Sequence, residues 1–477
     1  MKKIFITGIA LWMTVLICFG NTPNDKTQSL TKQEKVYALS VLWKELHYNF
    51  AFPERLQQVN IDSLYLAYIP KIEQAENYDY YRTLQAFLSH FNDGHTTLFD
   101  HLGRDFSQYD VPKLSVQVFG EKIIIENMAE SMADKLPIGS EITHIQHIPV
   151  AEYMRDSIFP YIAAAPNNKL SFGAWVVLFG KPNSLLHITV KTIEGTQSEA
   201  QLIRNIWATE EEKREKWAHP FNSNSNDYLP INIEIKQENI GYIQLNTFAP
   251  ASVIDTINAV FDQMLPQLRQ CKGLIIDIRN NGGGSERAWF NIVHHLVLTD
   301  TFTEGVSFAR EHSAERKAKG QACDSILMKL IGATFHDTPY VDYYKGTVMN
   351  ETFSYSFSNP VPDSLKLRQP LVILSGSGVA SAAEGFLLVM KEAKRGIIMG
   401  EPSKNSFGQP LFIQLPGDVV AMINASHIKS VDGTDFSQTG IPPDITVPMD
   451  VKAYLEGRDN VLERAIEELQ KMIKQKK

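Results

Sequence analysis

The stretch that decides the fold, residues 371–409, reads LVILSGSGVASAAEGFLLVMKEAKRGIIMGEPSKNSFGQ. Its apolar start at 371–374 predicts a buried strand, and a helical pattern runs over 384–393. Between them lies a run of small residues that includes Ser381. A strand that turns this tightly into a helix places the helix N-terminus, with its exposed N–H groups, beside the residue at the turn.

Ser381 has two interpretations at this position. A serine before a helix is commonly an N-cap, and Glu384 three residues later would complete a capping box. The same geometry suits a nucleophile, because N–H groups at a helix start can stabilise an oxyanion. Segment 371–409 alone leaves both interpretations open.

A second segment, residues 272–285, reads KGLIIDIRNNGGGS. Its apolar part predicts a strand at 273–278, and three consecutive glycines follow. Glycines permit positive φ and let another group approach the backbone closely. A glycine-rich exit from a strand into a helix is a ready anion or oxyanion site. The segment matches neither phosphate-binding pattern, G-x-x-x-x-G-K-[ST] or G-x-G-x-x-G, and a flexible loop is the alternative interpretation.

These two segments, in this order, resemble the tail-specific (C-terminal processing) and tricorn-type serine proteases. Asn239–Phe248, NIGYIQLNTF, is similar to the strand that opens the catalytic domain of that family. Gly440–Val447, GIPPDITV, is similar to the segment that closes it. The resemblance covers roughly residues 230–450 and implies a crotonase-like ββα superhelix there. It also implies an acyl-enzyme on Ser381.

The same resemblance implies the groups that would stabilise the oxyanion. One donor would be the backbone N–H of Ala382, and the other would come from Gly282 or Gly283.

The general base is where the branches of the family differ. Ser-Lys members carry a lysine in a Gly-Lys-Gly turn after a Gly-Glu-x-Thr motif. Here Gln409, after Phe407-Gly408, stands where that lysine would be expected, and Lys404 lies nearby out of register. Tricorn-type members use a histidine from the N-terminal helical region, and His95 in the turn Asn-Asp-Gly-His-Thr-Thr looks like that histidine. The resemblance is therefore closer to the Ser-His branch, with His95 as base and Lys404 as the alternative.

The third catalytic member stays open. In the tricorn type a carboxylate precedes the closing segment by about three positions, where this chain has Ser437. Asp435 and Asp432 are near enough to replace it, and Ser437 or Gln438 would orient an imidazole less strongly. This departure, together with the missing lysine, supports a second hypothesis: a catalytically impaired relative that binds a peptide or an apolar ligand.

Charge and composition exclude several classes of function. The 477 residues carry 46 Lys and Arg against 54 Asp and Glu, a net charge of −8, and no basic stripe typical of a nucleic-acid binder is present. No His/Cys/Asp/Glu cluster has metal-ligand spacing, so we expect no metal and no cofactor. Cys271 and Cys323 are too few for a disulfide framework, and a single bridge or two free thiols both stay open.

The N-terminus resembles a targeting segment. Lys2 and Lys3 precede a largely apolar run at 4–19, and small residues allow cleavage after Gly20. We predict a signal peptide at 1–20 and a secreted or periplasmic (cell-envelope) protein of the bacterial type. A lipid anchor on Cys18 or a retained N-terminal helix is the alternative, and would be the chain's one membrane attachment.

The remaining patterns predict a multidomain α+β protein. Apolar periodicity predicts three or four helices in an N-terminal bundle at 31–110, and a charged linker is expected at 206–228. Residues 112–205 resemble a PDZ domain, with strands at 114–119, 122–126 and 186–191. The catalytic-type domain at 230–450 alternates strands at 241–247, 273–278 and 371–375 with helices at 253–268, 285–298 and 382–394. Residues 300–368 look like an insertion with few periodic runs, and 451–477 like a C-terminal helix.

The leading hypothesis is a secreted or periplasmic serine endopeptidase that cleaves peptides or protein C-terminal tails. Its PDZ-like domain would hold the substrate tail or gate the site by adding an extended peptide to a sheet edge. A crotonase-like acyl-transfer enzyme is a third reading, which the targeting segment and the absence of an evident nucleotide motif disfavour. The sequence leaves open whether the chain forms a homo-oligomer.

Overall fold

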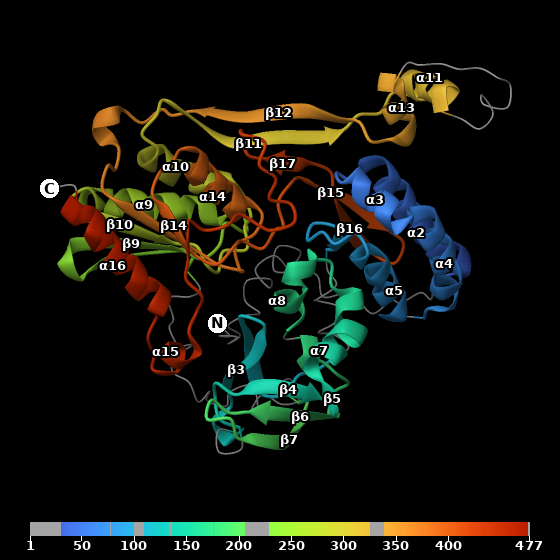
Figure 1. The fold of residues 1–477 in the computed structure, drawn as a ribbon, viewed down its shortest axis with the longest axis horizontal. Helices are drawn as coiled ribbons and strands as arrows, with labels where there is room; N and C mark the ends of the chain where they lie inside the picture. Colours follow the sequence, from blue (N-terminus) through green and yellow to red (C-terminus); the bar gives the residue numbers. More distant parts are fainter. Residues whose placement is uncertain are drawn as a thin grey trace.

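The computed structural model describes residues 30–76, 78–99, 109–132, 136–174, 176–205, 229–324 and 338–475. The expected signal peptide at 1–20 and the charged linker at 206–228 lie outside the described residues. Helices and several separate sheets are combined, as expected for an α+β protein (Figure 1).

The described N-terminal residues form four helices, which confirms the helical prediction: α2 (Lys32–Asn49), α3 (Pro53–Val59), α4 (Ile61–Gln74) and α5 (Tyr78–Ser89). Thr31 begins α2 with a capping box. The Thr31 hydroxyl oxygen accepts a hydrogen bond from the Glu34 N–H, and the Glu34 carboxylate accepts one from the Thr31 N–H. Leu39, Leu42 and Leu46 recur at helical spacing and are fully buried.

The helical core is completed by strands from the other end of the chain. β15 (Pro410–Leu415) and β16 (Val419–Asn424) form a hairpin, and β1 (Thr97–Leu98) pairs antiparallel with β16. Leu415, Val419, Ala421 and Ile423 are buried in the same core as the helices. Because β1 pairs with β16, the residues just before β1 lie next to the residues that flank this hairpin.

The β-rich segment is a second sheet, with strand order β2-β3-β4-β6-β7 and every pair antiparallel. The predicted strands are confirmed: β2 (Leu114–Phe119), β3 (Lys122–Met128) and β6 (Leu185–Lys191). The other members are β4 (Glu141–Ile145), β7 (Gln197–Ile203) and β5 (Ile148–Pro149), which pairs with β4. Short helical segments that include α7 (Val150–Tyr153) and α8 (Lys169–Gly173) lie between β5 and β6.

The central sheet is six-stranded, in the order β18-β14-β13-β10-β9-β8. It consists of β8 (Ile231–Lys236), β9 (Ile240–Leu245), β10 (Gly273–Asp277), β13 (Leu371–Ser375), β14 (Ile397–Gly400) and β18 (Ile445–Thr446). All neighbours are parallel except β8, which pairs antiparallel with β9 at one edge. Because parallel strands end at one edge, the two sequence motifs that follow β10 and β13 emerge side by side.

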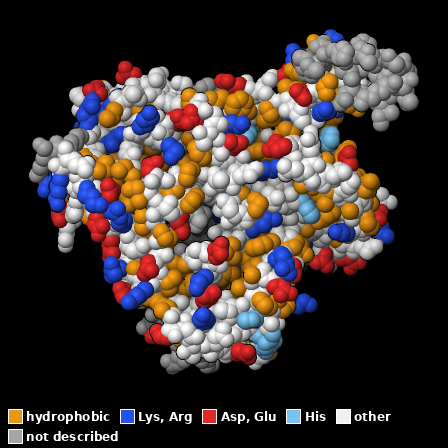
Figure 2. Space-filling view, viewed as in Figure 1, with side chains coloured by type: hydrophobic (Ala, Val, Ile, Leu, Met, Phe, Trp, Pro, Cys, Tyr) orange, Lys and Arg blue, Asp and Glu red, His pale blue; other side chains and the backbone are white. Residues whose placement is uncertain are grey.

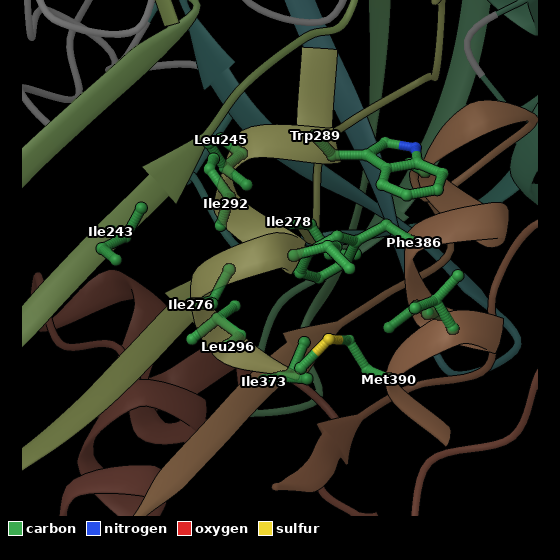
Figure 3. Packing of buried hydrophobic residues seen from close by; sticks show 14 of the residues in the cluster. Ile243, Leu245, Ile276, Ile278, Trp289, Ile292, Leu296, Ile373, Phe386 and Met390 are labelled. Atoms are coloured by element: carbon green, nitrogen blue, oxygen red, sulfur yellow. The ribbon is translucent and has the colours of Figure 1, made fainter. Parts of the chain in front are cut away.

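Helices cover both faces of this sheet (Figure 1). Ile276 of β10 packs with α9 (Val253–Leu268), α10 (Arg287–Leu296) and α14 (Ala382–Glu392), whereas the adjacent Ile275 packs against α16 (Asn460–Gln475). This alternation is the period-2 geometry of a strand buried on both faces. Figure 3 shows Trp289 of α10 beside Phe386 of α14, and Met390 of α14 beside Ile373 of β13, all in the larger core.

The predicted insertion has more regular structure than its sequence indicated. β11 (Thr301–Arg310) and β12 (Met349–Ser358) form a long antiparallel pair, with α11 (Ala314–Asp324) and α13 (Thr338–Lys345) at its far end (Figure 1). β17 (His427–Lys429) adds to the other side of β11. Polar residues alternate along β12, so no apolar run marks it. The C-terminal segment is two helices, α15 (Val451–Leu455) and α16, separated by Gly457 at φ 72°.

Candidate active site

Ser381 lies at the turn between β13 and α14, in a backbone conformation that is uncommon for a residue other than glycine. Its φ is 54° and its ψ is −126°. The turn is held because the N–H of Ser381 donates to the carbonyl oxygen of Ser406 at 2.8 Å and to the Glu384 carboxylate at 3.2 Å. The cap interaction with Glu384 is therefore present, and it does not exclude a chemical role. A strained serine between a strand and a helix is the geometry that presents a nucleophile.

The glycine loop packs directly on this turn. A Cβ at Gly283, where φ is 92°, would lie 2.7 Å from the Cβ of Ser381 and 3.0 Å from the N atom of Ala382. A Cβ at Gly284 would lie 2.2 Å from the carbonyl group of Phe248. The Phe248 N–H donates to the Gly283 carbonyl oxygen at 3.0 Å, which pins the loop. Only glycine fits these two positions.

The three expected oxyanion donors differ in their surroundings. Gly282 and Ala382 line the same cavity as Ser381. The N–H of Gly283 instead donates to the side-chain oxygen of Asn281 at 2.9 Å. The expectation of a donor from Gly282 or Gly283 is thus narrowed to Gly282.

His95 lines the same cavity as Ser381, although 286 positions separate them (381 − 95). The side chain is 8% exposed, and within the described residues its buried Nδ1 has no hydrogen-bond partner. Burial lowers the pKa of His95, while the charge of Asp93 and a hydrogen bond to the Gly408 backbone act in the opposite direction. A histidine with a lowered pKa is uncharged at neutral pH, as a general base must be.

The turn that carries His95 is held by a buried network. The Asp93 carboxylate accepts hydrogen bonds from the backbone N–H of His95 at 3.1 Å and from the Thr96 hydroxyl at 2.8 Å. Asn424 donates from its side chain to Asp93 at 3.1 Å and to the carbonyl oxygen of Phe407 at 3.0 Å. Asn424 therefore joins the His95 turn to the loop that precedes β15.

The structure does not bring Ser437 or Asp435 to His95. Asp435 accepts a hydrogen bond from His427 at 2.9 Å, and the carbonyl oxygen of Ser437 accepts from Arg55 at 2.8 Å. Neither residue lines the cavity that holds Ser381. The group that contacts the imidazole is the backbone of Gly408, which sequence reasoning missed because a backbone contact has no signature in residue type.

Glu384 has a second role that the sequence did not indicate. Besides the Ser381 N–H, its buried carboxylate accepts from the Ser403 hydroxyl at 2.6 Å and from the N–H groups of Asn405 and Ser406 at 2.9 and 2.8 Å. Burial raises the pKa of Glu384 to about 7, and these hydrogen bonds oppose that shift. One carboxylate thus ties the nucleophile turn to the loop 403–406.

Lys404, the alternative base, is half-buried and also lines this cavity. Its ammonium lies 3.8 Å from the ring centroid of Phe172 on α8, and its carbonyl oxygen accepts a hydrogen bond from Asn168. Burial lowers the pKa of Lys404 to about 8, with the charge of Glu384 acting against the shift. The site therefore contains two basic groups with lowered pKa values, and the β-rich segment contacts one of them.

The cavity has a volume of about 1350 Å³. Its wall combines the N-terminal helices, the β-rich segment and the central sheet, represented by Arg82, Tyr153 and Gln244. A cleft at the junction of three parts is a common place for a binding site. Figure 2 shows Lys and Arg side chains intermixed with Asp and Glu over one face of the molecule.

The described residues contain no group of three or more His, Cys, Asp or Glu side chains placed to hold a metal ion. No helix among them has the length and apolar character needed to cross a bilayer. Cys271 is a buried free thiol.

The region around Ser381 is similar to known peptidases. Residues 239–447 match peptidase family S41. The chloroplastic C-terminal processing peptidase of Tetradesmus obliquus is 26% identical over 232 residues, which are 47% of this chain. The match covers 39% of that relative's length, well under two thirds.

Solved structures share the fold at low sequence identity. Mature CPAF superposes with a TM-score of 0.65 at 14% identity, covering 93% of this chain and 98% of CPAF. A putative peptidase from Parabacteroides merdae ATCC 43184 gives a TM-score of 0.51 at 17% identity, covering 92% and 97%. The match of residues 239–447 to peptidase family S41 and the similarity to a C-terminal processing peptidase together support a serine-type peptidase.

Proposed function

We propose that this protein is a secreted or periplasmic serine endopeptidase that cleaves peptides or protein C-terminal tails. The observation that carries the proposal is the shared cavity: Ser381, His95, Gly282 and Ala382 all line it. The family match of residues 239–447 supports the same chemistry. The expected cleavage of a signal peptide after Gly20 supports the location.

In the proposed mechanism the Ser381 hydroxyl oxygen attacks the substrate carbonyl carbon while His95 takes the hydroxyl proton. The N–H groups of Gly282 and Ala382 stabilise the oxyanion. When the C–N bond breaks, His95 returns the proton to the leaving amine, and the acyl group stays on Ser381. A water molecule, deprotonated by His95, then attacks the ester carbonyl carbon. As the C–O bond to Ser381 breaks, His95 returns the proton to the Ser381 oxygen and the carboxylic acid product leaves.

The hydrogen bond to Gly408 supports the imidazole state that this mechanism needs. It raises the pKa of His95, so it is one in which the ring donates a proton to the backbone. With one ring nitrogen donating, the unpartnered Nδ1 keeps its lone pair and can accept the serine proton. In this proposal Gly408 takes over the orienting role of a third catalytic side chain.

The finer fold assignments belong to the same proposal. The antiparallel sheet of residues 114–203 would act as a PDZ-like domain, and the central sheet with its helices as a crotonase-like superhelix. The contact between Phe172 and Lys404 supports a substrate-holding role for the PDZ-like part, because it joins that part to the active-site loop.

The alternative function is a catalytically impaired relative that binds peptides or an apolar ligand. Three observations favour it: Gln409 stands where Ser-Lys relatives carry lysine, Ser437 replaces a carboxylate, and Asp435 is engaged with His427. The strained Ser381 and the glycine loop packed on it favour the enzyme.

Variants of residues 21–477 tested on casein and on a peptide with an apolar C-terminus distinguish these functions. We expect cleavage by the wild type, by Lys404→Met and by the control His144→Ala, whose imidazole is on β4 away from the cavity. Ser381→Ala and His95→Ala should abolish it. Loss in Lys404→Met but not in His95→Ala would assign the base to Lys404. Peptide binding without cleavage by any form would establish the alternative.

Size-exclusion chromatography with light scattering would show whether the protein is a homo-oligomer.

A further inference from the structure

Glu304 is a buried acid with nothing to neutralise it. It lies on β11, has no exposed surface, and within the described residues neither carboxylate oxygen has a hydrogen-bond partner. Its side chain lies against α14, because a Cβ at Gly385 would be 1.8 Å from Glu304 Oε1. Burying an unpartnered carboxyl group costs stability, so such a group calls for a functional explanation.

Glu286 places a second acid on the cavity wall with Ser381 and Ala382. It directly precedes α10, three positions before Trp289, so the two side chains share one side of that helix. The Trp289 indole N–H donates to the carbonyl oxygen of Ala382 at 2.9 Å. The side of α10 that carries Glu286 therefore faces the N-terminus of α14.

The two acids are neighbours that lack a counter-ion. Burial, and then the charge of Glu286, raise the pKa of Glu304, and burial raises the pKa of Glu286. In the described part of the chain neither residue forms an ion pair with a lysine or arginine. Glu286 lines the cavity, whereas Glu304 is fully buried against Gly385 of α14, so a cation that a ligand brings to this side of the cavity would compensate the pair.

We propose that Glu286 and Glu304 form an acidic subsite that binds the basic side chain of the substrate residue whose carbonyl Ser381 attacks. This inference rests on the proposed peptidase function and names its substrate class. The attacked carbonyl lies at Gly282 and Ala382, so the side chain of the same substrate residue starts close to Glu286. A planar guanidinium, which carries several donors, suits a pair of carboxylates especially well.

The path to the acids suits the stem of a lysine or arginine. Ile428 of β17 lines the cavity. It pairs with Ser307 on the neighbouring strand β11, and Ser307 is three positions from Glu304 on that strand. Long basic side chains pack their methylene groups on apolar surface while the charged end reaches polar groups. Ile428 would contact the stem, and the two carboxylates would contact the charged end.

The test uses quenched-fluorescence peptides that differ only at the attacked residue, which is Arg, Lys, norleucine or Glu. We expect kcat/KM of the wild type to be about 100-fold higher for Arg than for norleucine, the discrimination typical of a buried charge pair. Glu286→Gln and Glu304→Gln should each reduce that ratio at least tenfold. Glu286→Lys should favour the Glu peptide over the Arg peptide. Glu401→Gln, a matched acid with a burial-raised pKa away from this cavity, should leave the ratio unchanged.

The outcomes separate this proposal from the proposed function. If the wild type cleaves norleucine and Arg peptides equally, and Glu286→Gln does not change the ratio, the acidic subsite is overturned while the peptidase stands. If the wild type cleaves nothing, the proposed function fails, and binding of the same peptides to Ser381→Ala decides the subsite. Equal affinity for Arg and norleucine would then overturn it, and tighter binding of Arg that Glu286→Gln removes would support it.

Discussion

The backbone of Gly283 lies against the side chain of Ser381, so closely that a Cβ on Gly283 would be 2.7 Å from the Cβ of Ser381. The two residues follow neighbouring parallel strands, β10 and β13, whose ends meet at one edge of the sheet. Their contact positions the serine and the glycine loop relative to each other without any side-chain interaction. A single added methyl group therefore has to displace one of the two.

Gly283→Ala and Gly195→Ala form a matched pair that tests this contact. The φ angles are 92° and 91°, so alanine strains both backbones similarly, by about 1 kcal/mol. No atom lies within 4 Å of a Cβ at Gly195. We expect Gly283→Ala to lower kcat/KM more than 100-fold and Gly195→Ala to leave it nearly unchanged. Similar kinetics of both variants would show that the contact does not position the serine.

The pH dependence of kcat/KM should identify the base. A base acts when it is unprotonated, so the rate rises with pH through its pKa and then levels off. Because burial lowers the pKa of His95, its limb lies below pH 6.5. Burial lowers the pKa of Lys404 to about 8, so a lysine base would place the limb near pH 8. We expect a plateau from about pH 7 upward, and a midpoint near 8 would contradict the assignment to His95.

Glu384→Gln should destabilise the protein by about 2–4 kcal/mol, since its amide group would replace one acceptor with a donor facing N–H and hydroxyl groups. Urea unfolding at pH 7 measures the change. Glu463→Gln, at a partly exposed position on α16, is the control and should change stability by less than about 0.5 kcal/mol. Equal midpoints for the two variants would contradict the role of Glu384 as the link between Ser381 and loop 403–406.

The stability of the wild type should also depend on Glu384 through pH. Its folded pKa is raised from 4.5 to about 7, so between these values the folded chain holds a proton that the unfolded chain has released. The stability that the folded state gains from holding this proton is therefore fully present below pH 4.5 and is lost as the pH rises through 7. The difference in unfolding free energy between the wild type and Glu384→Gln should shrink from pH 4.5 to 7. A difference that grows with pH would show that the ionised carboxylate is the favoured form.

Asn424→Ala should slow the reaction without weakening substrate binding. It removes the hydrogen bonds from the Asn424 side chain to Asp93 and Phe407, which hold the His95 turn against the loop before β15. We expect kcat to fall about tenfold with KM unchanged, as for a positioning residue. Asn291→Ala removes a comparable bond to Asp262 on the exposed surface and should leave kcat as it is. Parallel losses in both variants would indicate general destabilisation.

The parts of this fold that the sequence predicted are those with local patterns. Helix 253–268 and strand 371–375 agree with α9 and β13 to the residue, because the helix has a clear apolar periodicity and the strand is a continuous apolar run. The β11–β12 pair was not predicted: β12 does alternate polar and apolar residues, as a half-buried strand does, but neither strand contains the continuous apolar run that marks the buried strands of the central sheet. In the site, glycines and a serine at a turn are visible in sequence. The partner of Asp435 was not predictable, because only the folded chain shows that His427 reaches it first.

The pairing of β1 with β16 has a consequence for the order in which the chain is made. The turn with His95 leaves the ribosome early, but its strand partner at 419–424 and the Asn424 that holds it come more than 300 positions later (424 − 95 = 329). Until those residues emerge, the His95 turn lacks its strand partner and the side chain of Asn424. Under the proposed mechanism, a chain that is still being synthesised would therefore have no positioned base, and activity would begin only when almost the whole polypeptide is complete.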